Sequence, residues 1–145
     1  MAKKKFVTFT DKELQSIYYY DLGPDEIDVS SYPQRQKDQY ALFAKTCSQC
    51  HTLARAINSP HVGRGAWEIY VLRMRLRSQF KGGTAITRKE AKAILNFLAY
   101  DAKVRKVSGK AEFKSLTRRL RKRFDETVDE RMRRLHEANP ERFRE

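Results

Sequence analysis

The chain has 145 residues and carries 31 Lys and Arg against 18 Asp and Glu, a formal net charge of +13. This length supports one core with extensions. No run of about eighteen apolar residues occurs, which argues against a transmembrane helix, and the start lacks the apolar stretch of a signal peptide.

The first predicted element is a helix that opens at the capping box Thr10–Glu13 and continues through Tyr18. It is expected to stop near Gly23, and an extended connector follows as far as Pro33. We treat residues 1–33 as an N-terminal extension, which packs either on this chain's own core or on a partner.

Three longer helices are predicted in residues 34–101, and a loop is expected over 54–65. The first helix spans 34–46, the second about 66–80, and the third follows the capping box Thr87–Glu90. Each carries apolar side chains at helical spacing: Tyr40, Phe43 and Ala44; Trp67, Tyr70, Val71 and Met74; Ile94, Leu95, Phe97 and Leu98.

Residues 102–145 form a predicted basic tail that is mostly one amphipathic helix ending at Asn139–Pro140. Its apolar seam consists of Phe113, Leu116, Leu120, Phe124, Val128, Met132 and Leu135. An apolar seam of this length is expected to pack on another surface. The candidates are this chain's own domain, a partner protein and an anionic membrane, and packing on a partner is favoured. The expected fold class is all-α.

The two cysteines of the chain stand together in the segment Cys47-Ser48-Gln49-Cys50-His51. This spelling is the attachment signature of a c-type haem, in which two thiols form thioethers and the next residue ligates the iron. A redox dithiol would need a preceding strand, and none is predicted. A zinc site would need a second ligand pair at suitable spacing, and His61 and His136 do not supply it.

Residues 40–98 resemble a small class I c-type cytochrome. Phe43, four residues before Cys47, holds the place of an aromatic that packs on the last helix of that family, while Gln39 stands where the family often has a small residue. The resemblance implies a cytochrome c-like helical domain over residues 34–101 around one covalent haem, held by Cys47 and Cys50 with His51 as proximal ligand.

The other site residues are assigned less directly. Met74 is the predicted distal ligand because a thioether raises the haem potential, although a Met in an apolar stripe also serves as core filler. His61 is the second candidate, and an open sixth position the third. Further candidates for the haem pocket or its propionates are Arg55, Arg64 and Trp67, and Pro60 is a candidate to orient the proximal imidazole.

The expected function is one-electron transfer, without catalysis, in a respiratory or photosynthetic complex. The basic group Arg73, Arg75, Arg77 and Lys81 suits docking with an acidic redox partner. The alternative is a haem-based sensor or peroxidase-like protein with an open sixth site. Nucleic-acid binding is disfavoured, because acids flank the basic run at 118–123 and no recognition motif accompanies it.

Haem attachment of this type takes place outside the cytoplasm, so we expect an extracytoplasmic location such as the periplasm, intermembrane space or lumen. Since no signal peptide is recognised, export with a partner or by a route without a cleaved signal is expected, unless the start is trimmed or replaced.

Overall fold

The computed structural model describes residues 8–48, 52–80 and 84–143. Within these ranges every regular element is helical, which confirms the all-α prediction there. In chain order the elements are α1 (Asp11–Leu14), the 3-10 turn η1 (Tyr19–Asp21), α2 (Gln34–Cys47), α3 (Ala54–Asn58), α4 (Arg64–Phe80), α5 (Arg88–Asp101), the π-helical turn η2 (Ala102–Ser108), α6 (Lys110–Ala138) and the 3-10 turn η3 (Pro140–Phe143).

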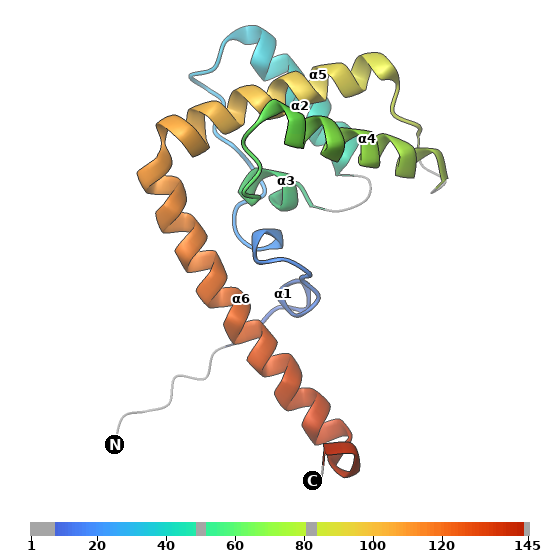
Figure 1. Cartoon of the computed structure of the whole chain (residues 1–145), viewed down its shortest axis with the longest axis vertical. Coiled ribbons are helices and arrows are strands. Elements are labelled where there is room, and N and C mark those ends of the chain that lie inside the picture. Colours follow the sequence, from blue (N-terminus) through green and yellow to red (C-terminus); the bar gives the residue numbers. More distant parts are fainter. Residues whose placement is uncertain (1–7, 49–51, 81–83, 144–145) are drawn as a thin grey trace.

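The core lies where α2 and α4 pack against α5 (Figure 1). Phe43 of α2 and Phe97 of α5 are fully buried, and their ring centroids are 5.6 Å apart. Tyr40 lies one turn before Phe43 and places its ring 5.3 Å from that of Phe97. Gln39 is buried on the same helix, and its amide oxygen has no hydrogen-bond partner among the described residues.

Local sequence signals match the start of α5 and the end of α6. The Thr87 hydroxyl accepts the Glu90 backbone N–H at 3.1 Å, and the Glu90 carboxylate accepts the Thr87 N–H at 3.3 Å. This reciprocal pair opens α5 as predicted. The tail helix α6 ends at Ala138, directly before the predicted stop at Asn139–Pro140.

The prediction of one helix from Thr10 through Tyr18 is wrong, because α1 ends at Leu14. The Ser16 hydroxyl donates to the Glu13 carbonyl at 2.7 Å. The Asp21 carboxylate then accepts the backbone N–H groups of Ile17 and Tyr18, each at 2.9 Å. Side chains that bond the backbone in this way compete with continuation of a helix.

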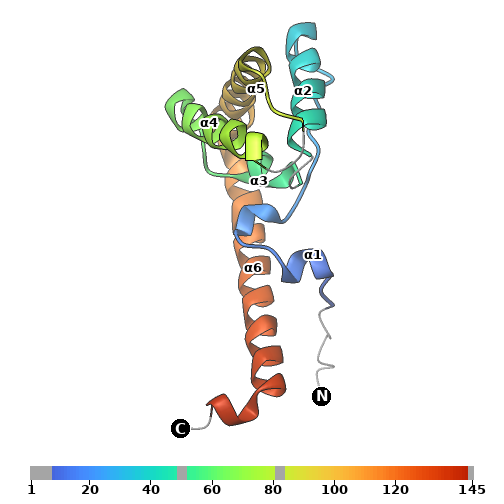
Figure 2. The same ribbon diagram turned by 90° about the vertical axis from the view of Figure 1, so that its right-hand side faces the viewer.

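A sharp change of direction separates α5 from α6, and η2 and Gly109 lie at that point (Figure 1). A Cβ on Gly109 would lie 2.7 Å from the Arg105 carbonyl oxygen, so the bend needs glycine. Beyond it, α6 leaves the helical cluster and extends away from it, as the perpendicular view also shows (Figure 2). None of the helices that the structure describes combines the length and apolar character needed to cross a bilayer.

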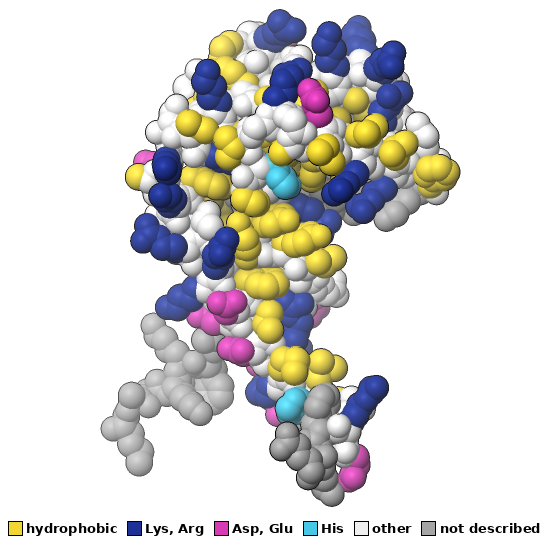
Figure 3. All heavy atoms as spheres, viewed as in Figure 1, with side chains coloured by type: hydrophobic (Ala, Val, Ile, Leu, Met, Phe, Trp, Pro, Cys, Tyr) yellow, Lys and Arg dark blue, Asp and Glu magenta, His cyan; other side chains and the backbone are white. Residues whose placement is uncertain are grey.

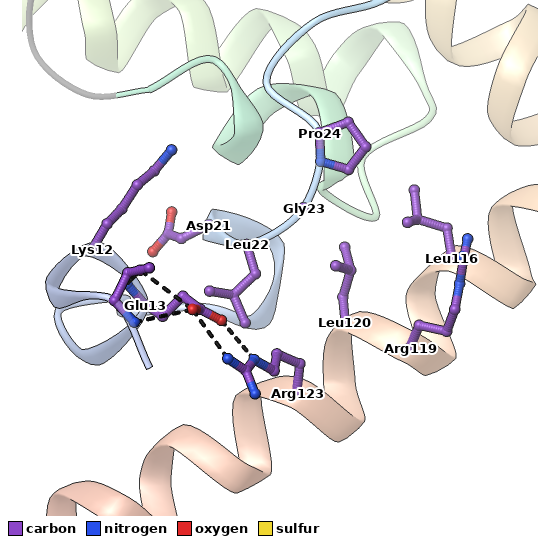
Figure 4. A pocket seen from close by; sticks show the side chains of 11 residues that line it. Lys12, Glu13, Asp21, Leu22, Gly23, Pro24, Leu116, Arg119, Leu120 and Arg123 are labelled. Atoms are coloured by element: carbon purple, nitrogen blue, oxygen red, sulfur yellow. Dashed lines mark hydrogen bonds and ion pairs between the residues drawn. The ribbon is translucent and has the colours of Figure 1, made fainter. Parts of the chain in front are cut away.

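The N-terminal segment lies on this chain's own tail helix, with α1 and η1 packed against α6. Arg123 donates from Nε and Nη2 to the two carboxylate oxygens of Glu13, at 2.6 and 3.1 Å (Figure 4). Arg131 donates to the Ser16 carbonyl at 2.9 Å. Part of the seam of α6 is therefore covered from within the chain, whereas Val128, Met132 and Leu135 stay exposed.

Candidate functional site

The first cysteine of the motif is the last residue of α2, and its side chain is buried. Cys47 lies close enough to Tyr70 of α4 to affect its titration. Burial is the main cause that raises the pKa of the Tyr70 phenol, and Cys47 raises this pKa further. Cys50 and His51, the predicted second thioether and proximal ligand, lie outside the described residues. The chain continues at Thr52 and forms α3, which begins at Ala54.

A cavity of about 130 Å³ lies beside Tyr70 and brings several predicted residues together. It is lined by Tyr18, Tyr20, Arg55, His61, Tyr70, Arg73, Met74 and Arg77. Met74, the predicted distal ligand, and His61, its alternative, therefore line the same cavity. At roughly 30 Å³ for each water molecule in the liquid, the space suits a carboxylate-bearing edge of a cofactor and not a whole porphyrin.

Two buried polar atoms at this site lack partners. The Trp67 indole Nε1 and the Tyr70 hydroxyl are inaccessible to solvent, and neither has a hydrogen-bond partner among the described residues. Leaving such a group unsatisfied costs about 1–3 kcal/mol. The His61 ring packs edge-on against Trp67, with centroids 5.4 Å apart. Tyr70 lines the cavity, so an acceptor such as a cofactor carboxylate bound there would satisfy its hydroxyl, and this residue fits an anionic cofactor edge.

The arginines of the cavity differ in what they bind. Arg55, a predicted propionate partner, donates from Nε to Asp21 at 2.6 Å and from Nη2 at 3.3 Å. Burial favours the protonated form of Asp21, but the hydrogen bonds from Arg55 and two backbone N–H groups outweigh it and lower the pKa of this carboxyl. Arg55 is therefore already paired within the chain.

Arg73 and Arg77 stand one turn apart on α4 and line the cavity. Neither forms an ion pair with a carboxylate in the described part of the chain. From the sequence both were predicted to belong to a basic docking patch close to Met74, and their place in the lining of a cavity with Tyr70 was not predicted. Arg73 follows Tyr70 by three residues and Arg77 follows Met74 by three, and this spacing along one helix is the signal that groups them.

Arg64 lies apart from this group. It sits at the start of α4, donates to the Asn96 side chain at 3.0 Å, and pairs with Glu68 at 3.7 Å. Its side chain is about half exposed, at 52%. Trp67, by contrast, is fully buried in the core and reaches the site through its contacts with His61 and Tyr70.

A buried lysine that the sequence analysis did not single out holds the chain between α3 and α4. The Lys106 ammonium donates to the carbonyls of Ser59 at 2.7 Å and His61 at 3.1 Å. It also lies 4.9 Å from the centre of the Trp67 ring. Through these contacts Lys106 fixes the Ser59–His61 segment, which contains Pro60, against the indole.

Burial is the main reason that the pKa of Lys106 falls from its usual 10.5 to about 7. The unfolded chain therefore binds more protons than the folded chain between these values, and stability rises with pH there. Relative to a Lys106→Met variant, the wild type should gain up to about 1.4 kcal/mol per pH unit across this window. Urea unfolding of both proteins at several pH values measures this, and a pH-independent difference would contradict it.

The surroundings of His61 favour the neutral form of its imidazole. Burial lowers the pKa of His61, and the positive charges of Lys106 and Arg73 lower it further. A neutral imidazole is the form that ligates a metal ion. The lining of the cavity therefore brings together a thioether, an imidazole and two arginines that have no carboxylate partner among the described residues.

Comparison of the chain with protein-family models, with curated proteins and with solved structures finds no match.

Proposed function

We propose that this protein holds one c-type haem through thioethers to Cys47 and Cys50, with His51 as proximal ligand, and that it transfers single electrons. The observation that carries the proposal is the position of the first cysteine of the motif. Cys47 is buried at the end of α2, near Tyr70 of α4. The same helix α4 bears Met74 and the Trp67 N–H, which has no partner among the described residues.

The packing of α2 on α5 supports the resemblance to class I c-type cytochromes. Phe43, four residues before Cys47, packs against Phe97 with the two rings tilted, where α2 contacts α5. The family resemblance implies this aromatic contact between the helix that carries the haem motif and the last helix of the domain. Tyr40 extends the contact by one turn.

The residues around the cavity would serve the haem in different ways. A bound haem supplies an iron that changes its charge by one electron. The Met74 sulfur is the proposed distal ligand, and the Trp67 N–H, the Tyr70 hydroxyl and the guanidinium groups of Arg73 and Arg77 are the proposed propionate partners. Tyr18 and Tyr20 line the cavity together with Arg55, and Arg55 is paired with Asp21. In this proposal the two tyrosine rings limit the access of water to the haem from the N-terminal segment.

The outer face of α4 is the proposed docking surface for the redox partner. Four large apolar side chains are exposed there at helical spacing: Ile69, Leu72, Leu76 and Phe80. Arg73 and Arg77 belong to the same helix. An apolar centre with basic neighbours suits a partner whose surface is acidic around an apolar patch, in a membrane-bound electron-transfer complex located outside the cytoplasm.

A redox titration of protein made in a host with haem-attachment enzymes tests the function. We expect one reversible one-electron transition, and a reduced spectrum that carbon monoxide does not alter, because both axial positions are filled. Rapid carbon monoxide binding would instead support the sensor or peroxidase-like alternative with an open sixth site. Absence of any redox transition would contradict electron transfer.

A further inference from the structure

The first half of α6 carries a row of cations that differs from the charges on the rest of this helix. Farther along α6, Arg123 is paired with Glu13, and Arg133 and Arg134 are paired with Glu130. In the described part of the chain, by contrast, no carboxylate forms an ion pair with the cations of residues 110–122. These cations are Lys110, Lys114, Arg118, Arg119, Arg121 and Lys122.

Four of these cations, Lys110, Lys114, Arg118 and Arg121, line one pocket of about 690 Å³, which opens between α6 and the segments that contain Tyr19 and Pro60. Its volume lies within the range of roughly 300–1,000 Å³ typical of small-molecule sites. The lining also includes Phe113, Thr117 and Lys106, and no acidic residue from the described part of the chain belongs to it. Figure 3 shows Lys and Arg side chains beside hydrophobic ones along the upper part of α6.

The neighbouring pocket on α6 has a different electrostatic character. It has a volume of about 520 Å³ and lies between α6 and the segment from Thr10 to Pro24 (Figure 4). Its lining includes the carboxylates of Glu13 and Asp21, and Arg123 is already bound to Glu13. The absence of acids from the lining of the first pocket is therefore specific to that site and is not a general property of the helix.

Aromatic side chains form part of the wall of the cationic pocket. The Arg121 guanidinium lies over the Tyr19 ring, 4.7 Å from its centre, which leaves the N–H groups at the edge of the guanidinium directed away from the ring. Phe113 lies one turn from Lys110 and Thr117 on the same helix. A ligand for this site therefore needs negative charge for the cations and an apolar or aromatic part for these rings.

We infer that the pocket binds an organic phosphate. The phosphate groups are held by Lys110, Lys114 and Arg118, and the apolar or aromatic part of the ligand packs on Tyr19 and Phe113. Lysine and arginine side chains are the usual partners of phosphate oxygens. This inference does not rest on the haem proposal, because none of these residues lies in the haem motif or lines the cavity beside Tyr70.

Calorimetric titration of the purified full-length chain tests the site, with ATP, adenosine and inorganic triphosphate as probes. ATP is expected to bind more tightly than triphosphate, and adenosine alone is expected not to bind. In a second arm, vesicles of phosphatidylglycerol are compared with vesicles of phosphatidylcholine. Binding to the anionic vesicles alone would identify the same phosphate chemistry in a lipid headgroup.

A double variant, Lys110→Gln with Lys114→Gln, should weaken binding about a hundredfold, since each lost charged contact is worth about tenfold in affinity. The matched control is Lys89→Gln with Lys92→Gln, which removes the same charge from exposed positions on α5. The control should change binding by less than about twofold if its charges act only at long range. Equal weakening in both variants, or no binding of any phosphate probe or anionic vesicle, would overturn the inference.

Discussion

Replacing Phe97 with alanine is expected to lower the free energy of unfolding by about 3–5 kcal/mol. Phe97 has no solvent-exposed surface, and the rings of Phe43, Tyr40 and Tyr32 pack around it. Truncation removes the centre of the contact between α2 and α5 and leaves a cavity that rigid helices fill only in part. Urea unfolding followed by circular dichroism measures the change.

The matched control for this prediction is Phe80→Ala at the end of α4. Phe80 is 83% exposed, so the same truncation should alter stability by about 0.5 kcal/mol or less. If both variants lost similar stability, the crossing of α2 and α5 would not be the main source of the fold's stability.

Replacing Met74 with alanine is expected to lower the reduction potential on the order of 0.1 V or more, within the range of about 0.8 V over which axial ligands set haem potentials. The physical reason is that a thioether ligand favours ferrous iron. Opening of the sixth position should also let carbon monoxide bind the reduced protein at once. Potentiometric titration and absorption spectra of the holoprotein measure both effects.

Met132→Ala is the control, because Met132 is 46% exposed on α6 and does not line the cavity. It should leave the potential and the spectra unchanged. An unaltered potential and spectrum in the Met74→Ala variant would contradict Met74 as the distal ligand and would favour His61, the other candidate ligand that lines the cavity. A His61→Ala variant would then show the shift.

The longer helices were predictable because their signals are local. The capping box at Thr87 and the repeated apolar side chains of residues 94–98 define α5, and Asn139–Pro140 ends α6. The short helix α3 was predicted as a loop. It has only five residues, and four of them are buried, so its sequence carries no alternation between an apolar and a polar face.

The parts that the sequence did not reveal depend on contacts between distant segments. Asp21 pairs with Arg55, which lies 34 positions away, and together with Ser16 it interrupts the predicted N-terminal helix. Lys106 looks like any other cation of the basic tail until the fold buries it against Ser59 and His61. Periodicity and spacing cannot report such pairings, since they describe only neighbours along one element.

The candidate site was predictable in part. The spacing of Trp67 and Met74 on one helix correctly suggested that both face the interior, and both are buried. Arg64 was a candidate on residue type alone, and it lies outside the cavity with Glu68 and Asn96 as partners. Arg73 and Arg77 line the cavity and have no carboxylate partner among the described residues. From the sequence they were predicted to form a docking patch close to Met74, because several basic residues occur together there.

Covalent attachment of haem is tested most directly by denaturing the protein after its production with haem-attachment enzymes, and then measuring haem on the chain by gel staining and intact mass. We predict that haem stays on the denatured wild-type chain and is lost from a Cys47→Ala, Cys50→Ala double variant, because thioethers survive unfolding and axial ligation does not. A wild-type chain that is colourless, or that releases its haem on denaturation, would contradict the assignment of a c-type haem to this motif.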